Sequence, residues 1–128
     1  MAHTGIYATS AECTAKAGDN YDSTNVTEEL INGYCKQAEG LINSAARYVF
    51  AVDLTAFTAM PAGGKYLLTE IATNIVEIYM IGYNMRGDDG NKNRIISEDQ
   101  INIARDAALR GLGMLRDKKI VEFIKTGA

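Results

Sequence analysis

Few side chains in this 128-residue sequence are of the types that carry out catalysis. The only histidine is His3, and the only cysteines are Cys13 and Cys35. A nucleophilic thiol needs a nearby base or positive charge to lower its pKa, and no histidine stands near Cys35 in the sequence. Two cysteines are also too few for a zinc site or a disulfide framework. We therefore expect both thiols to be buried and free, as in a reducing cytoplasm.

Carboxylates are more numerous, but their spacing fits no metal site that we tested. Glu70 and Glu77 stand two helical turns apart and could begin a metal site between helices, yet the Glu-x-x-His partners of that chemistry are missing. Asp19 and Asp22 lie in a turn-rich stretch, but they lack the ligand alternation, the central glycine and the terminal glutamate of a calcium loop. We expect no metal, no cofactor and no catalytic residue. Glu70 and Glu77 then belong to a solvent-facing stripe or accept hydrogen bonds from tyrosines.

The carboxylates Glu70 and Glu77 lie on the stretch that organises the chain, residues 66–83. Its apolar residues recur with the rhythm of a helix and cover most of the circumference, which predicts a helix in the middle of a bundle. Its polar residues fall on one narrow stripe and are Glu70, Thr73, Asn74 and Glu77. Two glutamates and an asparagine argue against a membrane span.

Three further helices are predicted from caps and periodicity. A short helix runs from Thr9 or Ser10 to Lys16 and stops at Gly18. The next begins at Asn25, with Glu28 completing a capping box, and continues to Tyr48 with Cys35 on its buried stripe. Gly33 and Gly40 within it indicate close helix approach. The last begins at the capping box of residues 97–100 and ends near Asp117.

The sequence therefore predicts a single all-α domain over residues 1–128, a small bundle of about four helices. Residues 1–8 are expected to form an N-terminal arm that has neither the basic nor the apolar region of a signal peptide. Residues 119–128 form a C-terminal arm, whose apolar run is too short for periodicity to separate helix from strand.

A long link, residues 49–65, separates the second helix from the central one, and connections of this length are often functional. It is apolar, so it either folds over the bundle as a lid or meets another chain. The candidate interface combines its apolar residues with those of the C-terminal run: Val52, Leu54, Phe57, Met60, Ile120, Val121, Phe123 and Ile124.

The net charge of −3 gives no electrostatic reason to expect nucleic acid binding. A small regulatory or DNA-binding helical protein remains an alternative, because the last long helix carries Arg105, Arg110 and Arg116. Acidic residues are interspersed among these arginines, so a solvated face is the simpler interpretation.

The order of features resembles the small helical head-to-tail adaptor proteins of tailed bacteriophages, also called connector or head-completion proteins. The resemblance rests on four stretches, in chain order IYATSAE, AEGLINSAARY, LLTEIATNIVEIYMIGY and AALRGLGMLRDKKI. It covers about residues 7–124, and the 49–65 link and the 86–93 turn do not match the pattern closely.

This resemblance implies structural work in a virion. Such adaptors assemble, usually as twelve copies, into a ring between the portal and the tail or neck, and DNA passes through the channel without specific binding. A ring is a heterologous contact in which one patch meets a different patch on the neighbouring copy. The partners implied are other copies, a portal protein and a tail or neck protein, with no membrane. A neck or tail-completion protein is the nearest alternative.

Overall fold

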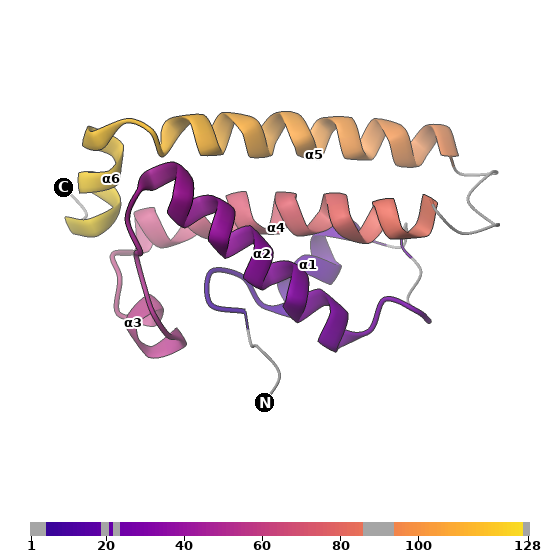
Figure 1. Ribbon diagram of the computed structural model, residues 1–128, viewed down its shortest axis with the longest axis horizontal. Coiled ribbons are helices and arrows are strands. Elements are labelled where there is room, and N and C mark those ends of the chain that lie inside the picture. Colours follow the sequence, from indigo (N-terminus) through magenta and orange to yellow (C-terminus); the bar gives the residue numbers. More distant parts are fainter. Residues whose placement is uncertain (1–4, 19–20, 22–23, 86–93, 127–128) are drawn as a thin grey trace.

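The computed structural model describes residues 5–18, 21, 24–85 and 94–126. Within these ranges the chain is helical, without strands, which confirms the all-α prediction (Figure 1). Six helices are present in the described ranges, where about four were expected. They are α1 (Ser10–Ala17), α2 (Glu28–Ala46), α3 (Leu54–Thr58), α4 (Ala62–Met85), α5 (Arg94–Met114) and α6 (Lys118–Thr126).

Helix α4 is the predicted central helix. It lies between α5 on one side and α1 and α2 on the other, and all three pack against it (Figure 1). Five of its large side chains are at most 1% exposed, namely Leu68, Ile71, Val76, Met80 and Ile81. The apolar side chains around this helix are therefore buried by neighbouring helices on several sides. None of the helices in the described ranges is long and apolar enough to cross a membrane.

Local capping explains where the first two helices begin. Thr9 and Glu12 form a reciprocal capping box at α1, and Gly18 ends the helix at a φ of 67°, where a side chain would be strained. The predicted start of α2 was wrong by a few residues. Thr27, not Asn25, accepts the N–H of Leu30, at 3.3 Å. A threonine directly before two glutamates supplies the hydroxyl cap and a favourable charge in the first turn.

Helices α4 and α5 both begin earlier than predicted. Pro61 stands just before the first residue of α4 and its carbonyl accepts the N–H of Lys65, so the proline and the two following glycines open the helix and do not form a loop. The capping box expected at residues 97–100 lies inside α5, which begins at Arg94. The predicted turn at 86–93 lies outside the described residues, as do Asp19 and Asp22.

The link between α2 and α4 is more ordered than an apolar loop. Asp53 caps a short helix, α3, by accepting the N–H of Ala56 at 2.8 Å. Phe57 on α3 turns inward and is 8% exposed. The prediction of a long loop over residues 49–65 is therefore corrected to a segment with its own helical turn, docked on the core through an aromatic side chain.

Residues 5–8 of the expected N-terminal arm are tethered to the core and not loose, because Tyr7 is 1% exposed. Its hydroxyl donates to Asn43 Oδ1 at 2.5 Å and accepts the N–H of Phe50 at 3.2 Å, while its carbonyl accepts from Thr69 at 2.7 Å. Its ring centroid lies 5.5 Å from that of Phe57. Through its side chain and its carbonyl, this one residue joins α2, the α2–α4 link, α3 and α4. Residues 1–4 of the expected arm, including His3, lie outside the described residues.

The C-terminal run is a helix and not an arm as far as residue 126. Ile124 on α6 is fully buried against the start of α4. A β-carbon at Gly64 would lie 2.6 Å from the Cα of Ile124, so only glycine permits this approach. Figure 1 places α6 at the same end of the molecule as α3. Residues 127–128 of the expected arm are not described.

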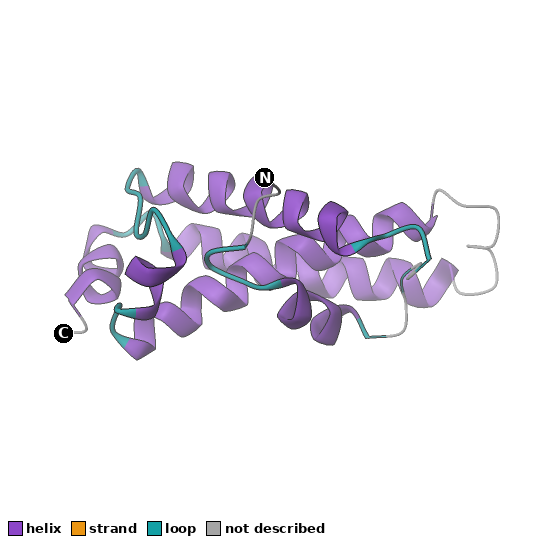
Figure 2. Ribbon diagram, turned by 90° about the horizontal axis from the view of Figure 1, so that it is seen from below, coloured by secondary structure: helices purple, strands orange, loops and turns teal. Residues whose placement is uncertain are grey.

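Close helix approach occurs at other glycines than predicted. A β-carbon at Gly33 or Gly40 would meet nothing within 4 Å, so the prediction of close packing there was wrong. The close approaches are at Gly64 and at Gly111, where α5 crosses Ile71 of α4. Glycines on an amphipathic helix mark contact only where they fall on its buried face, and Gly40 does not. Viewed from below, the described residues are helices and loops, without strands (Figure 2).

Candidate functional site

The predicted interface residues fall into three groups in the structure. Val52, Leu54 and Phe123 are exposed, at 78%, 47% and 42%. Met60, Ile120 and Val121 are partly buried against the core. Phe57 and Ile124 are core residues, at 8% and 0% exposure, and offer no surface in this conformation. The prediction of Phe57 and Ile124 as interface residues is corrected, because the short helices α3 and α6 dock on the core through these two side chains.

The exposed members gather at the end of the molecule that carries α3 and α6 (Figure 1). Tyr48 and Val49 are also exposed there, and the Lys125 ammonium of α6 lies 4.4 Å from the centroid of the Tyr48 ring. The ring of Phe123 lies beside Gly63 at the start of α4. We call this set the end surface; its members are Tyr48, Val49, Val52, Leu54 and Phe123. Tyr48 and Val49 are not among the predicted interface residues, because the sequence predicts Tyr48 only as the end of a helix.

A pocket of about 590 Å³ adjoins the end surface, between α1, α3 and α4. Leu54 and Tyr66 line it, and Tyr66 is 69% exposed. Lys65 on its wall donates to the carbonyl of Thr58 at 3.5 Å. The rest of its lining includes the ring of Phe57, a second lysine, Lys16, and two glutamates, Glu12 and Glu70.

A second exposed apolar group lies along α5 and was not predicted. It consists of Ile103, Leu109 and Met114, at 72%, 61% and 42% exposure. Arg105 and Arg110 of the same helix are exposed, as expected: Arg110 pairs with Asp106 at 2.8 Å and Arg105 donates to Asn102.

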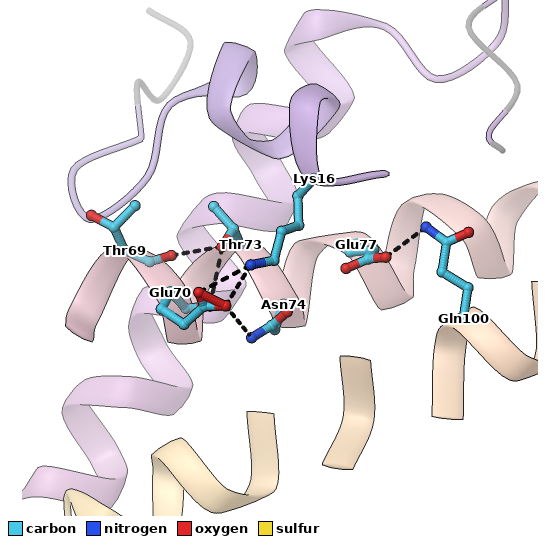
Figure 3. Close-up of polar contacts among 7 residues, drawn as sticks. All are labelled: Lys16, Thr69, Glu70, Thr73, Asn74, Glu77 and Gln100. Atoms are coloured by element: carbon cyan, nitrogen blue, oxygen red, sulfur yellow. Dashed lines mark hydrogen bonds and ion pairs between the residues drawn. The ribbon is translucent and has the colours of Figure 1, made fainter. Parts of the chain in front are cut away.

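The polar stripe of α4 fastens two neighbouring helices to it (Figure 3). Lys16 of α1 forms an ion pair with Glu70, with Nζ 3.0 Å from Oε2, and Asn74 donates to the same carboxylate at 3.1 Å. Gln100 of α5 donates to Glu77 at 2.6 Å and to the carbonyl of Ala17 at 3.1 Å. The glutamates thus bond with lysine and amide groups. Thr73, Asn74 and Glu77 are 4–6% exposed, so the stripe is not solvent-facing as a whole.

The pKa values of the two glutamates of this stripe are shifted in opposite directions. The Lys16 hydrogen bond lowers the pKa of Glu70 below its usual range. Burial raises the pKa of Glu77, and the hydrogen bond from Gln100 opposes that shift without cancelling it. A pocket of about 510 Å³ lies beside both carboxylates, between α1, α4 and α5. No group of three or more His, Cys, Asp or Glu residues in the described ranges is arranged to hold a metal ion.

Replacing Glu77 with glutamine is expected to stabilise the protein near neutral pH. Because the folded-state pKa of Glu77 is raised, its contribution is fully present below the unfolded pKa of about 4.3 and is lost as the pH rises through the folded pKa. Glutamine keeps an oxygen for Gln100 and carries no charge. The difference in Tm between Glu77→Gln and wild type, followed by circular dichroism, should be near zero at about pH 4 and positive at about pH 7. A lower Tm for the variant at neutral pH would mean that the carboxylate charge stabilises the fold.

The cysteines are buried and free, as predicted. Their contact was not predicted: Cys13 Sγ and Cys35 Sγ are 3.7 Å apart, between α1 and α2. Both stand on the buried faces of their helices, and this is the only signal in the sequence that could have paired them.

Comparisons with protein-family models, with curated proteins and with solved structures give no match.

Proposed function

We propose that this chain is a structural subunit of a bacteriophage head-to-tail adaptor, assembling as a ring between the portal and the tail or neck. The proposal rests on the resemblance of the sequence over about residues 7–124 and on one observation about its surface. Five apolar side chains of the end surface are at least 40% exposed at one end of the molecule. Exposed apolar side chains gathered at one end of a small protein are typical of interaction sites.

The arrangement of the end surface supports a contact with another protein. Val52 and Leu54 come from the α2–α4 link and Phe123 from α6, so elements distant in sequence contribute exposed apolar side chains to one end of the molecule. The exposed apolar side chains along α5 are a separate group. A heterologous ring contact needs two different surfaces on each subunit, and the end surface is our candidate for one of them.

The direct test is electron microscopy of particles that contain the protein, with rotational averaging about the tail axis. A ring of small helical subunits between portal and tail supports the adaptor. A position further along the tail axis would assign the protein to the neck or tail-completion class. Absence from all particles, together with salt-dependent retention on DNA, would favour a helical regulatory protein.

A matched pair of substitutions tests the end surface itself. Val52→Asp is expected to lower incorporation into particles roughly tenfold, because a charge in an apolar contact costs more than 1 kcal/mol. Its Tm should stay within a few degrees of wild type, because Val52 is 78% exposed. Ile103→Asp places the same charge on α5, where Ile103 is 72% exposed, and tests whether the exposed apolar side chains of α5 also contribute to incorporation. Unchanged incorporation of Val52→Asp would remove the end surface from the contact.

A further inference from the structure

The two cysteines of the chain form a matched pair in the core. Cys13 lies on α1 and Cys35 on α2, and both are 0% exposed. Their sulfur atoms are 3.7 Å apart, in van der Waals contact, whereas a disulfide bond is about 2.05 Å long. They are the only cysteines in the sequence, so no other thiol competes for either one.

We propose that Cys13 and Cys35 form a disulfide site, which a low-molecular-weight disulfide such as glutathione disulfide oxidises to a covalent link between α1 and α2. The site stands independently of the adaptor proposal, since it follows from the positions of two sulfur atoms. In a reducing cytoplasm the pair stays as two thiols, and in an oxidising compartment it closes.

The reaction balances as two successive exchanges. The thiolate of one cysteine attacks one sulfur of glutathione disulfide, whose S–S bond breaks and releases one glutathione thiolate. The other cysteine then loses its proton and attacks the Sγ of the first, which displaces the second glutathione. The two cysteines give up two electrons and two protons, and the oxidant becomes two glutathione thiols.

The two thiols share one hydrogen bond in which either sulfur can be the donor, so either thiol can react first. The pKa of Cys13 is raised by this hydrogen bond and by burial, which slows reaction of the pair while it is enclosed in the core.

Access to Cys35 is controlled by the N-terminal segment. A β-carbon built on Gly5 would lie 3.3 Å from the Cys35 β-carbon, so residues 5–8 cover this thiol. The Glu39 carboxylate holds the segment by accepting the N–H of Ile6 at 2.7 Å and that of Tyr7 at 3.4 Å. Oxidation of the folded protein must wait for this segment to open, whereas refolding in the presence of the oxidant removes that barrier.

The test uses the full chain in a glutathione redox buffer and compares two samples. In one, the folded, reduced protein is transferred into the buffer; in the other, the reduced, unfolded chain is refolded in it. Trypsin cleaves after Lys16 and Lys36, so the disulfide would join fragments 1–16 and 17–36 in a mass spectrum taken without reductant. We expect this linked pair from the refolded sample, no free thiol by colorimetric assay, and a Tm roughly 10 °C above that of the reduced protein. Dithiothreitol should release the linked fragments, restore the free thiols and lower the Tm again.

Cys13→Ala is the matched control, because it keeps Cys35 and leaves it no partner within the chain. It should give no linked fragments and no gain in Tm from the same buffer. Two free thiols after refolding in excess glutathione disulfide would overturn the proposal, and so would disulfides found only between chains. An oxidised protein less stable than the reduced one would show that the geometry of the pair does not fit the bond, and would equally overturn it.

Discussion

Replacing Tyr7 with alanine is expected to reduce the free energy of unfolding by about 3–5 kcal/mol, the usual cost of truncating a buried aromatic side chain. Tyr7 is 1% exposed, and its hydroxyl bonds with both Asn43 and the Phe50 N–H. Truncation leaves a cavity beside Phe57 and removes the partners of two polar groups. The total free energy of unfolding of a small domain is only about 5–15 kcal/mol, so this single change removes a large part of it. Urea denaturation followed by circular dichroism measures it.

Two companion variants keep the Tyr7 experiment informative even if the alanine variant does not fold. Tyr7→Phe retains the ring and loses only the hydroxyl, so it should cost about 1–3 kcal/mol. Tyr66→Ala removes the same side chain from a site that is 69% exposed and should change stability by at most about 0.5 kcal/mol. A loss below about 1 kcal/mol for Tyr7→Ala would mean that residues 5–8 do not dock in solution as they do here.

The behaviour of Tyr7 also shows why part of this fold could not be predicted from the sequence. Helices α1, α2 and α4 were recognisable because capping residues and the helical apolar period are local signals. The docking of residues 5–8 depends on partners more than thirty residues away, such as Glu39, Asn43 and Thr69. No local pattern around Tyr7 distinguishes a buried tyrosine from one on a loose arm.

The prediction of the candidate interface also lacked information about contacts between distant parts of the chain. Apolar composition identified the α2–α4 link and the C-terminal run, but it could not tell which side chains each short helix turns inward. Phe57 and Ile124 became core, whereas Val52 and Phe123 stayed exposed. The amphipathic period of α6 separates Ile124 from Phe123 only after the run is known to be a helix. The same reason hid the meeting of Cys13 and Cys35, which requires the packing of two helices.

A single methyl group at Gly111 is expected to destabilise the packing of α5 on α4. A β-carbon there would lie 2.9 Å from Cδ1 of Ile71 and nearer still to its Cγ1, in a buried contact between α5 and α4. Gly111→Ala should therefore cost about 2–3 kcal/mol through overpacking, although alanine is the better helix former. Gly113→Ala, two residues along the same helix, meets nothing within 4 Å and should gain roughly 0.5–1 kcal/mol.

The clash at Gly111 has a specific partner, so a double-mutant cycle can identify it. Ile71→Ala removes the Cγ1 and Cδ1 atoms and by itself costs about 2–5 kcal/mol, because Ile71 is 1% exposed. In that background Gly111→Ala places its methyl group in the vacated space and should become neutral or stabilising. The free energies of unfolding of the four proteins, from urea titrations, give the coupling directly. Additive costs would contradict the predicted contact, because they would mean that α5 shifts as a whole and does not press on this one side chain.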